Sequence, residues 1–417
     1  MRPLQLRPTY GQNLVVFFGV LCSLLLLAGC NSEGEALVLP TRVSVSAEVT
    51  ADVDAPTEVV RGNAPTLPPT WTPTPIITAT PLPPTPTPEI VQSGRVFYIY
   101  NGDSIISMNG DGTNNQFILT FGVGALIEDM VMSPDHSLLA FVAPGNGSAR
   151  EVFVSNLDGT FVLQVSCLGF AEVREPTWSP DSASLAFFGA PALGAVTDVY
   201  AVNVNGSGNC PADNNQRMLF STGTAQPGDV AWSPDGSRIF YSAQGIRIFD
   251  LNTGENSVEV TQTPGFGPDF NLTFNPANPV QLAYIRREGS FDGRAAGGSV
   301  FILDTSTIAS STLPIAVAGQ ALQISWDADG QYLVLSDQGA VVLSEIETGS
   351  ARRVVSFLET MPSAVFDSER EFVIYVGRDP QNENVDQVFS ISRLGADNAQ
   401  LTTHTEGTVS DLIWIAD

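Results

Sequence analysis

Seven polar side chains recur along the chain at intervals of 40 to 54 residues, and four of them are carboxylates. They are Asp129, Glu175, Asp229, Asn271, Gln323, Ser363 and Asp411. Carboxylates held close together repel one another, which raises some of their pKa values unless a cation or water relieves them. Calcium prefers such oxygen ligands. If the fold places these side chains around one mouth of a central channel, they predict a binding site there. The ligand is calcium, at Asp129, Glu175, Asp229 and Asp411, or a basic loop of a partner. The alternative is that the channel mouth is only solvated and that the polar residues merely end each strand.

Other catalytic side-chain sets are scarce in the sequence. All 18 basic residues are Arg, which excludes Schiff-base, phosphate-loop and Ser-Lys chemistry. We interpret the two histidines, His136 and His404, as solvated turn residues. No Gly-x-Ser-x-Gly nucleophile motif occurs. The sequence therefore favours binding over catalysis and predicts no catalytic residue. Paired carboxylates still leave a propeller-type carbohydrate-active enzyme open as the alternative.

The charge balance is strongly acidic, with 44 acidic residues against 18 Arg and a formal net charge of −26. Such a surface repels phosphate backbones, so nucleic acid is excluded as a partner. The excess charge is typical of a soluble, self-repelling surface. An attraction for cations or basic partners is the other interpretation.

A large apolar residue stands three positions after each of the seven polar residues. These anchors are Met132, Trp178, Trp232, Phe274, Trp326, Phe366 and Trp414. Four short strand-like runs fit into each interval, and a period of this length with four strands is typical of a β-propeller blade. Because the anchors recur once per unit, we interpret them as residues that pack blade against blade rather than as sugar-stacking residues.

The two ends of the repeat region are complementary. The first runs, at Val96–Tyr100, Ser104–Met108 and Phe117–Thr120, lack a preceding anchor strand, and the last anchor, Trp414, lacks following strands. Together they complete one unit and leave no open sheet edge. Residues 95–417 are therefore predicted to form an all-β, seven-bladed β-propeller of four-stranded blades, closed by the C-terminal strand.

The runs Trp178–Asp181 and Trp232–Gly236 resemble the Trp-Ser-Pro-Asp-Gly repeats of TolB-like propellers, a WD-type variant. The resemblance covers about residues 95–417 and implies a propeller fold with a bias toward protein binding in the cell envelope. TolB has six blades and a separate N-terminal domain, so the resemblance does not carry over the function of TolB itself.

The N-terminus carries an export signal. Arg2 and Arg7 precede the uncharged stretch Leu14–Leu27, which is too short to span a bilayer but suits a signal peptide. Leu27–Cys30 then resembles the lipobox of bacterial lipoproteins. That resemblance implies cleavage between Gly29 and Cys30, removal of residues 1–29, and covalent lipid, such as palmitate-bearing diacylglycerol, on Cys30. An ordinary secretory peptide that happens to end in Cys is the alternative.

Residues 30–94 are predicted to be a disordered tether. The run Ala64–Pro88 is dominated by Pro and Thr, which favour polyproline II and cannot build a core. A stiff spacer is the expected role, and a Pro-rich ligand for a partner domain is the alternative. Cys167 and Cys210 remain for the folded part. Export permits a disulfide between them, but their expected places near opposite ends of neighbouring blades favour free thiols.

These features predict an extracytoplasmic binding or scaffold module, lipid-anchored to a bacterial membrane and facing the cell surface or the periplasm. The expected partner is an envelope or extracellular protein, or a glycan. The expected bound groups are the lipid on Cys30 and calcium. The sequence leaves the ligand, the binding face and the identity of the membrane open.

Overall fold

The computed structural model describes residues 94–145, 149–204, 216–261, 268–287, 298–307, 309–312, 321–337, 339–356, 363–367 and 371–416. The predicted signal peptide, the lipid-bearing Cys30, nearly all of the predicted tether and Cys210 lie outside these residues. Strands, turns and bends make up the described part, and none of it forms a helix of the length and hydropathy needed to cross a membrane.

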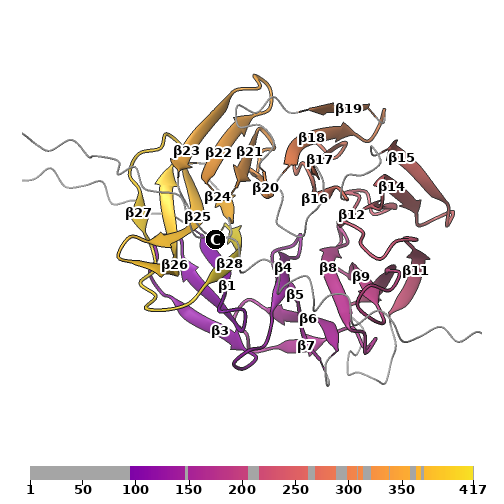
Figure 1. Ribbon diagram of the computed structural model, residues 1–417, viewed down its shortest axis with the longest axis horizontal. Coiled ribbons are helices and arrows are strands. Elements are labelled where there is room, and N and C mark those ends of the chain that lie inside the picture. The colour runs from indigo at the N-terminus through magenta and orange to yellow at the C-terminus, as the bar shows by residue number, and fades with distance from the viewer. Residues whose placement is uncertain are drawn as a thin grey trace, which may run out of the picture. The chain divides into compact units, whose positions relative to one another are not determined.

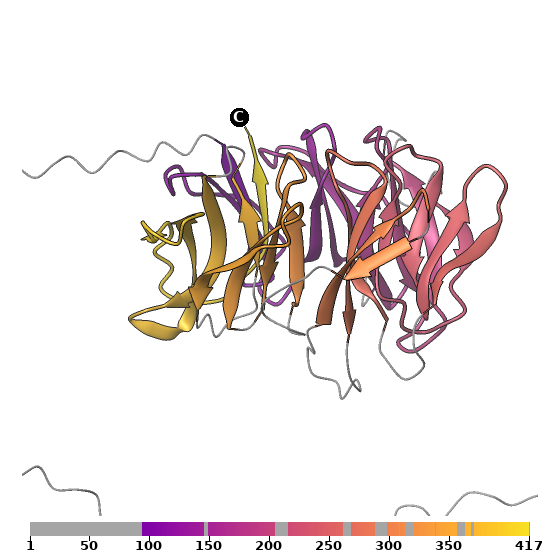
Figure 2. The same ribbon diagram turned by 90° about the horizontal axis from the view of Figure 1, so that it is seen from above.

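Seven four-stranded antiparallel sheets stand around a common axis, each with its first strand innermost (Figures 1 and 2). Blades 1 to 3 consist of β28 (Val409–Ile415), β1 (Arg95–Tyr100), β2 (Ser104–Asn109) and β3 (Gln116–Thr120); β4 (Glu128–Met132), β5 (Leu138–Pro144), β6 (Arg150–Asn156) and β7 (Val162–Gln164); and β8 (Glu172–Trp178), β9 (Ser184–Ala190), β10 (Asp198–Asn203) and β11 (Arg217–Ser221). Blades 4 and 5 consist of β12 (Val230–Trp232), β13 (Arg238–Ser242), β14 (Gly245–Asp250) and β15 (Asn256–Thr261); and β16 (Phe270–Phe274), β17 (Gln281–Arg287), β18 (Gly298–Asp304) and β19 (Ala309–Thr312). Blades 6 and 7 consist of β20 (Gln323–Trp326), β21 (Tyr332–Ser336), β22 (Ala340–Glu345) and β23 (Ala351–Ser356); and β24 (Ala364–Phe366), β25 (Phe372–Asp379), β26 (Asn382–Ser392) and β27 (Ala399–Gln400).

The C-terminal strand closes the ring, as the complementary ends of the sequence predict. β28 pairs with β1 in antiparallel register, and Trp414 stands opposite Val96. Figure 1 shows the yellow end of the chain beside its indigo beginning. The predicted seven-bladed, all-β propeller is thus confirmed.

The core of the propeller is divided into seven clusters, one between each pair of neighbouring blades. Each cluster holds one anchor residue. In blade order they are Met132, Trp178, Trp232, Phe274, Trp326, Phe366 and Trp414. The indole N–H groups of Trp178 and Trp326 donate to the backbone oxygens of Val131 and Thr273 in the preceding blades, at 3.3 and 3.1 Å. The anchors therefore pack blade against blade and, in these two cases, also hydrogen-bond across the junction.

A short polar side chain follows the inner strands of blades 2 to 7 and fixes the turn into the next strand. In blade 4, the Ser233 hydroxyl donates to Asp235 at 2.6 Å and accepts the backbone N–H of Arg238 at 2.9 Å. Asp327 of blade 6 takes the same place with its carboxylate, which accepts the N–H of Tyr332 at 2.9 Å. The Ser-Pro-Asp motif is therefore turn chemistry that places the second strand of the blade.

Cys167 is disulfide-bonded in the structure, so the expectation of free thiols was wrong for this residue. It follows β7, and its backbone N–H donates to the side chain of Gln216 in blade 3 at 2.6 Å. The cysteine therefore lies at the junction of blades 2 and 3, whereas the strand assignment from sequence placed Cys167 and Cys210 near opposite ends of neighbouring blades. Its partner lies outside the described residues.

Candidate functional site

The seven polar ring residues lie in the innermost strands or directly before them, with Glu175 and Asp411 inside their strands and the others within one residue of a strand start. Four of them, Asp129, Glu175, Asn271 and Asp411, have φ values between 50° and 55°, in the left-handed region that few non-glycine residues adopt. The pairing register of their strands slips at the same places. Each of these side chains is therefore turned by a β-bulge, while Asp229, Gln323 and Ser363 lie at or just before strand starts.

Ring side chains connect successive blades. Asp129 accepts the backbone N–H of Glu175 at 2.9 Å, and Asp229 accepts that of Leu272 at 2.6 Å. The further acceptors in the described part are Asn271, Ser363 and Asp411, which take N–H groups of Ile324, Leu412 and Met130 in the next blades. Glu175 and Gln323 are not among these acceptors, and the buried side-chain oxygen of Gln323 has no hydrogen-bond partner among the described residues. The ring thus satisfies backbone donors that the bulges remove from the ladders.

The ring carboxyls have raised pKa values. Burial is the main cause for all four, and it raises the pKa of Asp229 to about 6 and that of Asp411 to about 7. Burial and then the nearby Asp229 and Asp129 raise the pKa of Glu175 well above its ordinary value. Burial also raises the pKa of Asp129, although the N–H of Glu175 opposes it. Mutual repulsion, which the sequence suggested as the cause, is the smaller contribution.

Calcium gains no support from the geometry of this ring. Within the described residues, no group of three or more His, Cys, Asp or Glu side chains is arranged to hold one metal ion. Backbone N–H groups already occupy oxygens of Asp129 and Asp229. The ring is therefore first a set of links between blades, and the calcium site expected from the sequence is left to a test with added calcium.

A cavity of about 350 Å³ lies at the opposite end of the inner strands. Its walls include the aromatic anchors Trp326, Phe366 and Trp414, from blades 6, 7 and 1, and His136 from the turn after β4. The indole nitrogen of Trp414 is buried and has no hydrogen-bond partner among the described residues. This volume is in the range of pockets that hold small ligands or single side chains of a partner. The sequence did not single out this end, because the anchors are explained by packing alone.

Solved structures share the propeller fold. An oligogalacturonate lyase from Vibrio parahaemolyticus is similar with a TM-score of 0.52 and 12% identity, over 69% of this chain and 82% of that chain. TolB from Acinetobacter baumannii has a TM-score of 0.46 and 16% identity, over 78% and 67% of the two chains. A structure of prolyl endopeptidases has a TM-score of 0.48 and 14% identity, over 77% and 50%. No family model and no curated protein sequence matches the chain. Identities this low show the fold alone.

The histidines have different surroundings from each other. His136 is exposed in a turn, as expected, and lines the cavity. His404 was expected to be solvated, but it is half-buried between the tyrosines of β1. Its ring stacks on that of Tyr100, with 4.3 Å between the ring centroids, and its Nε2 lies 3.1 Å from the hydroxyl oxygen of Tyr98. Only ring closure brings these residues together, so no local signal in the sequence marks the contact.

Proposed function

We propose that the protein is an extracytoplasmic binding module, held at a bacterial membrane by a lipid on Cys30, that binds an envelope protein or a glycan at one face of its propeller. The face is the one bearing the cavity between Trp326, Phe366 and Trp414. That cavity is the observation that carries the proposal, because it combines aromatic walls with residues from several blades. The N-terminal signal sequence supports the location.

Catalysis at the ring is the second candidate function. The pKa of Asp411, about 7, suits a general acid near neutral pH. Glycoside chemistry needs such a carboxyl beside a second one in a substrate cleft. The aromatic cavity lies at the other end of the inner strands, and among the described residues Asp367 is the one carboxyl residue in its lining. The separation of acids from cavity therefore favours binding.

Exposed small residues at the cavity rim allow a test that leaves the core intact. Ala328 and Ala416 are exposed and line the cavity, so Ala328→Arg and Ala416→Arg fill its entrance. Ala192, an exposed residue in a turn of blade 3, provides the control Ala192→Arg. The full-length parent and variants are used to capture partners from envelope extract and are incubated with mixed cell-wall and extracellular glycans.

A partner held by the parent and by Ala192→Arg, but lost by both cavity variants, supports the proposal. A partner held equally by all four proteins places binding on another surface. If the parent produces shortened or unsaturated glycans and the Asp411→Asn variant does not, the protein is a carbohydrate-active enzyme instead.

A further inference from the structure

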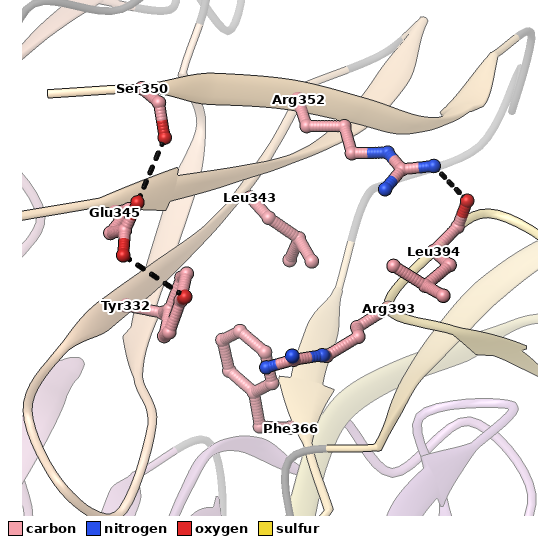
Figure 3. Close-up of a pocket in the computed structure, with 8 residues that line it drawn as sticks. All are labelled: Tyr332, Leu343, Glu345, Ser350, Arg352, Phe366, Arg393 and Leu394. Atoms are coloured by element: carbon pink, nitrogen blue, oxygen red, sulfur yellow. Dashed lines mark hydrogen bonds between the residues drawn. The ribbon is translucent and has the colours of Figure 1, made fainter. Parts of the chain in front are cut away.

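A second, smaller cavity lies between blades 6 and 7. It has a volume of about 180 Å³, and Figure 3 shows the side chains that surround it. Blade 6 contributes Tyr332, Leu343, Glu345, Ser350 and Arg352, and blade 7 contributes Phe366, Arg393 and Leu394. Phe366 also borders the larger cavity, so the two cavities share one wall.

The lining carries two guanidinium groups. Arg352 reaches from β23 across the cavity and donates through Nη2 to the backbone oxygen of Leu394 (Figure 3). Arg393 extends from the turn after β26 toward the ring of Phe366 (Figure 3). The whole chain has only 18 Arg and a net charge of −26. Two cations that face one cavity are therefore a local exception to the charge of the protein.

One carboxylate shares the cavity with them. Glu345 accepts hydrogen bonds from the hydroxyls of Thr348, Ser350 and Tyr332, at 2.6, 3.1 and 3.2 Å. These bonds, that of Thr348 first, lower the pKa of Glu345 and keep it ionised. Two guanidiniums and one carboxylate leave a net charge of +1 on the lining, which matches a single carboxylate of a ligand rather than a dianion.

The remaining walls are apolar. The rings of Tyr332 and Phe366 lie 6.4 Å apart, Leu343 is buried, and Leu394 is 63% exposed at the rim. A whole drug-sized ligand needs about 300 to 1,000 Å³. The cavity therefore has room for one apolar side chain, with its carboxylate at the guanidiniums.

We propose that this cavity binds a carboxylate attached to an apolar group, as at the C-terminus of a peptide that ends in Leu or Phe. The guanidinium of Arg393 and the remaining donors of Arg352 bind the carboxylate. The rings and the two leucines hold the apolar side chain. The site goes beyond the proposed function because it assigns a ligand chemistry to a different cavity.

The probes are the tripeptide acetyl-Ala-Ala-Leu with a free C-terminus, its C-terminal amide, and hexanoate as a carboxylate without a peptide. Ligand-observed NMR titrations with the full-length chain measure each Kd. The variants are Arg393→Gln and Arg352→Gln. Arg353→Gln is the matched control, since Arg353 is exposed on the same strand and does not line the cavity. Thermal melts establish whether each variant is folded. If Arg352→Gln is unfolded, the binding affinity of Arg393→Gln alone tests the proposal, because Arg393 is exposed and its replacement leaves the core unchanged.

The free-acid peptide should bind saturably. Amidation and Arg393→Gln should each weaken binding about tenfold or more, since charge-assisted hydrogen bonds are lost, whereas Arg353→Gln should bind as the parent does. Binding of hexanoate but not of the peptide identifies a small free acid as the source of the carboxylate. Equal binding of acid and amide, an equal loss in Arg353→Gln, or no saturation by either carboxylate up to about 10 mM overturns the proposal. Ala328 lines the larger cavity and not this one, so Ala328→Arg should bind the peptide as the parent does. The carboxylate site and the proposed binding face can therefore each fail without the other.

Discussion

The hydroxyl of Tyr98 lies 3.1 Å from Nε2 of His404, although 306 positions separate the two residues in the sequence. The contact joins β1 of blade 1 to the segment that follows β27 of blade 7. Burial raises the pKa of Tyr98 to about 12 and lowers the pKa of His404. Both groups are therefore neutral in the folded protein at neutral pH, and their contact links blade 7 to blade 1 beside the point of closure.

Replacing His404 by Ala should lower the free energy of unfolding by about 1–2 kcal/mol, because a stacked ring and a hydrogen bond are lost. Since the folded protein lowers the pKa of His404, the unfolded chain binds the proton more readily. The stability that His404 contributes should therefore be lost as the pH falls below its ordinary value of 6.5. Urea unfolding at about pH 5 and about pH 8 measures this. If the free energies of unfolding of parent and variant differ by the same amount at both pH values, the protonation of His404 does not affect stability in this range. The contact of His404 with the tyrosines would still be supported.

The ring acids should have the opposite pH dependence. The pKa values of Asp229 and Asp411 rise from 3.8 to about 6 and about 7 on folding. Their protonated forms therefore stabilise the fold at low pH, and this stability is lost as the pH rises through 6 and 7. Asp411→Asn keeps an acceptor for the backbone but carries no charge. It should be more stable than the parent by roughly 1–3 kcal/mol at about pH 8 and equal to it near about pH 4. A variant less stable at every pH would show that the carboxyl itself is needed.

Calcium should leave the melting temperature of the parent unchanged at neutral pH. The described ring residues form no group that could hold one ion, and backbone N–H groups already occupy several of their oxygens. Differential scanning fluorimetry with calcium, with magnesium and with chelator checks this. A rise specific to calcium that disappears in the Asp129→Asn, Asp229→Asn, Asp411→Asn variant would restore the calcium site.

Ending the chain at Thr408 should destabilise the whole propeller. β28 is the innermost strand of blade 1, and its loss exposes the inner edge of β1 and removes Leu412 and Trp414 from the cluster between blades 7 and 1. The melt should be broad or fall by more than about 10 °C. A chain that lacks only Asp417 is the control. An unchanged melting temperature in the shorter chain would mean that closure contributes little.

Cys30→Ser should abolish lipidation, and the protein should be released into the soluble fraction or stay unprocessed. The reason is that the thiol is the acceptor of the lipid that the Leu27–Cys30 motif predicts. Detergent partitioning and the mass of the mature N-terminus measure both outcomes. Membrane retention of a processed Ser variant would show that another segment anchors the protein.

The sequence was sufficient for the architecture because a propeller repeats its chemistry. The anchor Trp232 and the turn residues Ser233 and Asp235 form a local pattern, since the contacts they make lie within one unit or between adjacent units. Seven copies of that pattern set the number of blades, and the unpaired ends predicted closure. The predicted strand Val96–Tyr100 agrees with β1 (Arg95–Tyr100) to within one residue, because Gly94 precedes the apolar run and Gly102 and Asp103 follow it.

The site was less accessible to prediction. The left-handed φ of Asp129 and Glu175 has no local signal, because glycine is the usual residue there and neither is glycine. The hydrogen bond from the backbone of Cys167 to Gln216 joins blades 2 and 3, so no single blade contains a signal for it. The pairing of Arg352 with the backbone of Leu394 depends on the side-by-side placement of blades 6 and 7. Contacts of this kind arise from the assembled ring, and no single repeat contains them.

The place of β28 also sets the order of events in biosynthesis. Val96 enters the growing chain long before its partner Trp414, so blade 1 has three strands and an unpaired inner edge for almost the whole of synthesis. Blade 1 is therefore the last blade to be completed, because it needs β28, which is synthesised after the strands of all the other blades.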